Sequence, residues 1–122
     1  MANTNNKSRG GLPLQFIRMA VGASGLATTG QRLTYAMMLS HADKSYECWP
    51  GETRLARYNG VEVRQIRKNL RVLVKAKLAR KGSMRPIKLP DGRMSKLRAY
   101  RMAFPESVQK AVQEKADRAR GR

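Results

Sequence analysis

Residues 55–75 constrain the fold of this chain more than any other part of its sequence. The stretch contains a small residue, Ala56, and four positions later a glycine, Gly60. A small side chain lets two helices cross closely, and glycine readily adopts the left-handed conformation in which a helix often ends. The spacing therefore predicts a short helix ending near residue 59, a tight turn, and a second helix from about Glu62 to Ala76.

The second of these helices is predicted to have one apolar side and one cationic side. Its apolar residues recur at helical spacing and would hold it against the first helix: Val63, Ile66, Leu70, Leu73 and Val74. The residues left for the outward side are almost all basic: Arg64, Gln65, Arg67, Lys68, Arg71 and Lys75. This arrangement is typical of a helix-turn-helix whose second helix enters the major groove of DNA.

Charge is large in this chain and unevenly distributed. The 122 residues include 26 lysines and arginines against 8 acids, a formal net charge of +18. Self-repulsion of this size favours a polyanionic partner, with nucleic acid ahead of an anionic membrane. Residues 28–60 are nearly balanced, whereas cations greatly outnumber acids in residues 61–104. We therefore expect the first of these segments to be scaffold and the second to face the polyanion.

Several classes of function are disfavoured by what the sequence lacks. The single cysteine, Cys48, excludes an internal disulfide and a cysteine-cluster zinc site. No apolar run is long enough to span a membrane, and the N-terminal stretch is a poor signal peptide, so a cytoplasmic, nucleoid-associated protein is expected. There is no glycine-rich phosphate loop or nucleophile elbow. The sequence predicts no enzyme, cofactor or small-molecule ligand, and no metal site at the single histidine, His41.

Composition divides the chain into three parts. Residues 1–13 are predicted to be a disordered basic arm, residues 14–104 one domain, and residues 105–122 a basic C-terminal helix and tail. Residues 14–19 are expected to be an extended segment or a short edge strand. A stripe of small apolar residues on the C-terminal helix is the expected spare surface for contact between two copies: Val108, Ala111, Val112 and Ala116.

The rest of the domain is predicted to contain one more helix and a β-hairpin. A helix capped by Thr28 or Thr29 should reach about Asp43, and Glu47–Trp49 should form a short strand. Residues 78–84 and 94–104 read as two strands joined by a turn at Pro90-Asp91-Gly92. The expected fold is therefore mainly α with a small β-hairpin wing: a winged helix-turn-helix with a three-helix core, a two- or three-stranded sheet and a C-terminal helix. The core should include Trp49, Tyr100, Met102 and Phe104.

From about Leu26 to Met102 the sequence resembles the bacterial winged helix-turn-helix domains of plasmid and phage replication proteins and related transcriptional regulators. The matching landmarks lie in order along the chain: His41-Ala42-Asp43, Cys48-Trp49-Pro50, Leu55-Ala56, Gly60-Val61, Ile66 with Leu70, and Arg98-Ala99-Tyr100-Arg101-Met102. The resemblance implies DNA binding. The chain departs from the family pattern at Gly51 and Glu62, where serines are usual, and Glu62 would either repel phosphate or accept a hydrogen bond from cytosine.

The sequence therefore predicts a sequence-specific double-stranded DNA-binding protein, a transcriptional regulator or a replication or partition factor of a plasmid, phage or bacterial chromosome. Arg64, Gln65 and Lys68 are expected nearest the base edges. Arg67 and Arg71 on the same helix are expected at bases or phosphates, and Lys75 and Arg54 at the DNA backbone. The wing cations are expected at phosphates or in the minor groove: Arg85, Lys88 and Arg93.

Two other functions remain open at this point. One is a protein that coats nucleic acid without reading its sequence, which the scarcity of aromatic residues disfavours. The other is a winged helix that binds a protein partner, which the concentration of charge on the recognition helix and wing disfavours. A DNA reader of this size covers about half an operator, so we expect a monomer in solution and pairing of two copies on adjacent half-sites.

Overall fold

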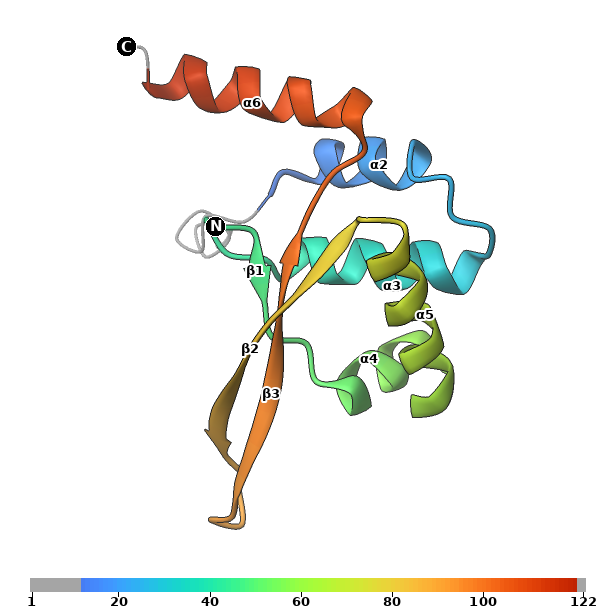
Figure 1. Ribbon diagram of the computed structural model, residues 1–122, viewed down its shortest axis with the longest axis vertical. Helices are drawn as coiled ribbons and strands as arrows, with labels where there is room; N and C mark the ends of the chain where they lie inside the picture. The colour runs from blue at the N-terminus through green and yellow to red at the C-terminus, as the bar shows by residue number, and fades with distance from the viewer. Residues whose placement is uncertain (1–11, 121–122) are drawn as a thin grey trace, which may run out of the picture.

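The computed structural model describes residues 12–120 of the protein. Its elements are α2 (Leu14–Gly22), α3 (Thr29–Ser40), β1 (Glu47–Cys48), α4 (Glu52–Asn59), α5 (Val63–Lys75), β2 (Ala79–Lys88), β3 (Met94–Met102) and α6 (Glu106–Arg120). Helices α3, α4 and α5 pack beside a three-stranded sheet from which the β2–β3 hairpin extends, while α2 and α6 lie at the opposite end (Figure 1). The predicted winged helix-turn-helix is confirmed.

The start of α3 is fixed by a reciprocal pair of hydrogen bonds. The backbone N–H of Gln31 donates to the Thr28 hydroxyl at 3.1 Å, and the backbone N–H of Thr28 donates to the Gln31 side-chain oxygen at 3.4 Å. The helix ends at Ser40, three residues before the predicted end at Asp43. The Asp43 carboxylate instead accepts hydrogen bonds from the backbone N–H groups of Ser45 in the following loop, at 2.8 Å, and of Glu47 at the start of β1, at 3.0 Å. This side chain therefore organises a turn toward β1.

The turn between α4 and α5 has the predicted geometry. Gly60 caps α4 with φ of 69°, and the backbone N–H of Val61 donates to the carbonyl of Ala56 at 3.0 Å. Ala56 is buried at the crossing of the two helices. The apolar side of α5 is also as predicted, because its Ile66, Leu70 and Leu73 side chains are buried in the core.

The sheet has strand order β1–β3–β2, and both pairings are antiparallel. Strand β1 ends at Cys48, opposite Tyr100, so only β2 and β3 pair in the outer part of the hairpin. An irregularity in β2 between Lys81 and Met84 brings Gly82 against Ala99. A Cβ atom on Gly82 would lie 3.2 Å from the Ala99 carbonyl oxygen, so this close approach of the strands favours glycine.

The interpretation of residues 14–19 as an extended segment was wrong, because these residues begin helix α2. The backbone N–H groups of Phe16 and Ile17 donate to the carbonyl of Pro13 at 3.0 and 3.3 Å, which closes the first turn. Phe16, Ile17 and Ala20 lie at helical spacing and are buried against the core. Of the predicted arm, residues 1–11 lie outside the described part of the chain, and Leu12 packs against the core.

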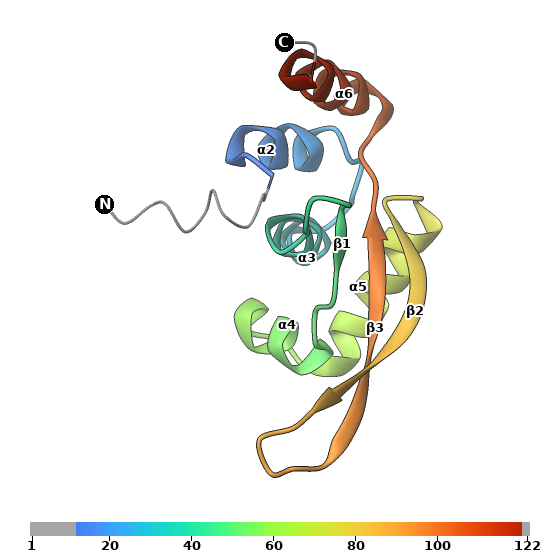
Figure 2. The same cartoon turned by 90° about the vertical axis from the view of Figure 1, so that its left-hand side faces the viewer.

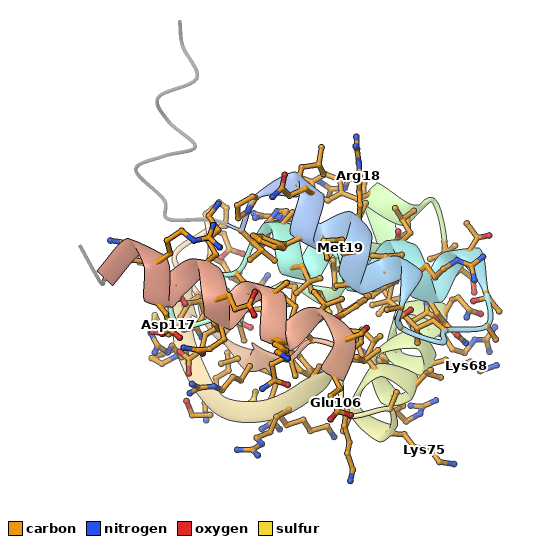
Figure 3. All side chains as sticks on the ribbon, turned by 90° about the horizontal axis from the view of Figure 1, so that it is seen from above. Arg18, Met19, Lys68, Lys75, Glu106 and Asp117 are labelled. Carbon is orange, nitrogen blue, oxygen red and sulfur yellow. The ribbon has the colours of Figure 1, made fainter. Side chains whose placement is uncertain are left out.

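The sequence predicted that the apolar stripe of α6 is a spare surface for a second copy, and this prediction was wrong. The stripe already belongs to the core of the protein. Only 2% of Val108 and 8% of Val112 are exposed, and Ala111 packs beside them. Figure 3 shows α6 lying along α2. The Lys115 ammonium lies 5.4 Å from the ring centre of Phe16 on α2. Deletion of residues 105–122 would therefore uncover the core and could not isolate an effect on pairing.

We predict that Gly60→Val lowers the free energy of unfolding by about 1–3 kcal/mol, because a β-branched residue is strained at positive φ. No atom lies within 4 Å of the position that a Cβ would take, so the cost is conformational rather than steric. Gly60→Asn, whose side chain tolerates the left-handed region, should cost distinctly less. Denaturant unfolding followed by circular dichroism measures both, and equal stabilities of the two variants would contradict this explanation.

Candidate nucleic-acid interface

The cationic side of α5 faces away from the core. All six polar residues predicted for this side are exposed: Arg64, Gln65, Arg67, Lys68, Arg71 and Lys75. Figure 3 shows Lys68 and Lys75 pointing outward from the helix. The N-terminal end of α5 lies toward the side of the molecule to which the hairpin extends, away from α2 and α6 (Figures 1 and 2). The start of α5 and the hairpin can therefore approach one extended partner together.

A buried polar residue, Asn69, lies within the apolar side of α5. Its side-chain N–H groups donate to the Thr34 hydroxyl at 3.1 Å and to the Gly30 carbonyl at 3.4 Å, both on α3. The Asn59 amide at the end of α4 donates to the same hydroxyl at 3.3 Å, and that hydroxyl donates to Gly30 at 2.8 Å. Asn69 and Thr34 are almost fully buried. We call these four residues the Asn69 network; it joins all three helices of the core.

The Asn69 network also reaches the exposed side of α5. The Gln65 side-chain amide donates to the Asn69 side-chain oxygen at 3.1 Å. An amide group has two N–H donors and one oxygen acceptor, so the second donor and the oxygen of Gln65 remain for another partner. Asn69 was missed by the sequence analysis, although its position between Ile66 and Leu70 in the apolar stripe was a signal for a buried polar group.

Two arginines on α5 are paired with acids. Arg67 Nε lies 2.9 Å from Glu52 Oε1 at the start of α4, and Arg64 Nη2 lies 3.5 Å from Glu62 Oε1. The side chains of Arg64 and Glu62 are 82% and 80% exposed, so water weakens their attraction and leaves Arg64 free to move. Arg67 is held more closely toward α4. Among the ion pairs of the described residues, none involves Lys68, Arg71 or Lys75.

The wing cations are exposed but differ in their contacts. Arg93 Nε lies 2.6 Å from Asp91 Oδ2 in the turn, so an acid partly neutralises this cation. The Arg85 guanidinium stands over the Trp49 ring, 4.1 Å from its centre. Lys88 is exposed near the end of β2. The structure thus brings Arg85 against the protein body, which the sequence did not predict.

A groove of about 620 Å³ separates the start of α4 from the wing. Arg54 and Arg57 line it from α4, and Ile87 and Leu97 line it from the hairpin. Trp49, predicted to lie in the core, is instead half-buried and lines this groove. The N-cap of α4, Gly51, has no side chain that could cap the first turn, so the backbone N–H groups there can donate hydrogen bonds to an anionic partner.

The chemistry of Cys48 is consistent with a structural role. Burial, and secondarily the charge of Asp43, raise the pKa of the Cys48 thiol to about 12. The group is therefore a neutral thiol at physiological pH rather than a reactive thiolate. Within residues 12–120, no group of three or more histidine, cysteine or acidic side chains could hold a metal ion. No helix in that range is both long and apolar enough to cross a membrane.

Residues 28–79 match the family model of a helix-turn-helix domain. The match covers α3, β1, α4, α5 and the first residue of β2, which include the helices that the structure arranges as a helix-turn-helix. No curated protein matches the sequence. A solved structure from Methanosarcina mazei Go1, described as a possible transcriptional regulator, aligns with 87% of this chain and 81% of its own, at 17% identity and a TM-score of 0.46. A likeness at that level does not bear on function.

We predict that Asn69→Leu lowers the free energy of unfolding by about 1–3 kcal/mol, because the buried Thr34 hydroxyl and Gly30 carbonyl lose a hydrogen-bond donor. Lys68→Leu is the matched control, since it introduces the same side chain one position earlier, on the exposed side of α5, and should change stability by about 0.5 kcal/mol or less. Denaturant unfolding measures both variants. An Asn69→Leu protein as stable as the wild type would show that the network does not hold the helices together.

Proposed function

We propose that this helix-turn-helix protein is a sequence-specific reader of double-stranded DNA, acting as a transcriptional regulator or as a replication or partition factor of a plasmid, phage or bacterial chromosome. The observation that carries the proposal is the cationic side of α5, exposed opposite a buried apolar stripe and oriented by the Asn69 network. The major groove of DNA admits one α-helix. Side chains held in fixed positions on that helix can form hydrogen bonds with the base edges in the groove. A cytoplasmic location on the nucleoid belongs to the same proposal.

Base reading is assigned to the N-terminal half of α5. Arg64 and Lys68 can donate to guanine, and Gln65 can form a two-hydrogen-bond contact with adenine. The hydrogen bond from Gln65 to Asn69 uses one amide donor and leaves the pair of groups that adenine requires. The rotamer of Gln65 is therefore partly set before DNA arrives, which lowers the entropy lost on binding.

Phosphate contacts are assigned to the cations around this reading surface. Arg67, Arg71 and Lys75 continue along α5, and Arg54 lines the groove toward the wing. Arg85, Lys88 and Arg93 extend the positive surface along the hairpin. Contacts of this kind fix the register of a protein on the duplex and supply most of the salt-dependent affinity.

The placement of the aromatic side chains favours this function over a coat for single-stranded nucleic acid. Stacking on unpaired bases requires exposed rings. Four of the seven aromatic residues are buried, Tyr46 and Trp49 are half-buried, and Tyr58 alone is mostly exposed. A second copy on an adjacent half-site remains part of the proposal. Because α6 already packs against α2, that contact would have to use a surface other than the α6 stripe.

We predict a steep salt dependence of duplex binding. If about five to eight phosphates are neutralised, the logarithm of the association constant should fall against the logarithm of salt concentration with a slope of about −4.5 to −7. Fluorescence anisotropy of a labelled duplex over a series of salt concentrations measures this slope. A slope shallower than about −2 would mean that the cationic surface is not the interface.

We predict that Arg64→Ala and Gln65→Ala each weaken binding to the preferred duplex by about 1–3 kcal/mol and binding to random duplex much less. The preferred duplex would be obtained by selection from a randomised library. Lys75→Ala, assigned to phosphate, is the control and should weaken both duplexes by similar factors. Equal losses on the two duplexes for Arg64→Ala and Gln65→Ala would reassign these residues to the backbone.

A further inference from the structure

The outer part of the hairpin needs support from the protein body. Among the described residues, no third strand joins β2 and β3 beyond the Cys48–Tyr100 pair. Nearly every β2 residue from Arg80 onward is exposed, so the ribbon buries little surface of its own. Two-stranded ribbons are marginally stable alone and twist freely. Some contact with the body must therefore set the direction in which the wing points.

The Arg85–Trp49 stack is such a contact. Trp49 directly follows β1 and precedes α4, so its ring belongs to the body, whereas Arg85 lies beyond the irregularity of β2 and pairs with Leu97 in the wing. The guanidinium lies 4.1 Å from the ring centre, within the range of a cation–π interaction. The stack therefore connects the body to the wing beside the groove that separates the wing from α4.

No hydrogen bond of the described structure orients the Trp49 ring. Its Nε1 is buried and has no hydrogen-bond partner within the described structure. Buried indole N–H groups usually find a partner, which orients the ring. In this protein, packing contacts and the guanidinium of Arg85 orient the ring instead. The position of the ring and the position of the wing are therefore coupled.

We propose that Arg85 is a positioning residue: by stacking on Trp49 it holds the wing at the angle that DNA binding requires. This inference rests on the proposed function and revises the expectation that Arg85 acts as a phosphate contact. The two roles differ in chemistry. A phosphate contact requires charge, which lysine also supplies, whereas the planar guanidinium covers an aromatic face far better than the compact, strongly hydrated ammonium of lysine.

The sole tryptophan makes the stack measurable without DNA. In the free protein, acrylamide quenching of Trp49 fluorescence should increase by about twofold or more in both Arg85→Lys and Arg85→Leu, because the ring loses the group that covers it. Lys88→Leu and Lys88→Arg are matched controls three residues further along β2 and should leave quenching at the wild-type value. Far-UV circular dichroism and thermal unfolding would establish that every variant is folded.

Duplex binding by the same variants shows whether Arg85 acts by positioning the wing or by contacting phosphate through its charge. Arg85→Lys and Arg85→Leu should both lose about 3- to 10-fold in affinity, the size of one cation–π contact. Lys88→Leu should also lose affinity, but Lys88→Arg should recover it. In a Trp49→Leu background, Arg85→Lys should cause no further loss, whereas Lys88→Leu should cause the same loss as in the wild-type background.

Three results would overturn the inference. Unchanged quenching in both Arg85 variants would mean that the stack does not form in solution. Wild-type affinity of Arg85→Lys, together with a loss in Arg85→Leu, would make Arg85 a simple charge contact. Additive losses of Arg85→Lys and Trp49→Leu would show that the two residues act separately. If the wild-type protein binds no duplex, the proposed function fails and this role fails with it, and the quenching data then report only whether the stack exists.

Discussion

The hydrogen bonds of the buried Asn69 amide are the constraint on which the reading surface depends. Apolar contacts from Ile66, Leu70 and Leu73 draw α5 onto the core but tolerate small rotations about the helix axis. A buried amide tolerates far less, because its donors lose their partners when the helix turns. The Asn69 network is not fully satisfied within residues 12–120, since Asn59 Oδ1 is buried and makes no hydrogen bond there. The unpaired oxygen lowers the stability of the protein somewhat, whereas the hydrogen bonds of Asn69 fix the rotation of α5 about its axis.

Three of the eight acids of this very basic chain pair with arginines on the surface assigned to DNA. Glu52 holds Arg67, Glu62 lies beside Arg64, and Asp91 holds Arg93. Each pair reduces the repulsion among neighbouring cations in the free protein and contributes little free energy by itself. On a duplex, phosphates would compete with Glu52 and Asp91 for the guanidinium groups of Arg67 and Arg93, which are assigned to the backbone. The cost of breaking these two pairs would subtract from affinity at every site, so it would affect cognate and random DNA alike.

Local chemistry in the sequence predicted the helix-turn-helix and the hairpin. Gly60 marks the turn, the spacing of Ile66 and Leu70 marks the buried side of α5, and Pro90-Asp91-Gly92 marks the hairpin turn. Helix α2 could not be assigned with the same security, because short helices depend on the tertiary contacts that bury them. The sequence also predicted correctly which cations are exposed. It did not predict the residues with which these cations form ion pairs or stacking contacts. The Arg67–Glu52 pair and the Arg85–Trp49 stack join residues from different elements, which no local pattern encodes.

The position of Cys48 ties the geometry of the wing to the stability of the core. Cys48 is fully buried, pairs with Tyr100 and directly precedes the tryptophan that supports the wing. Exposure of this thiol requires β1 to separate from β3, an opening that would also release Trp49. Local unfolding at β1 would therefore also remove the support of the wing, whereas loss of the Arg85–Trp49 stack alone would leave β1 paired with β3.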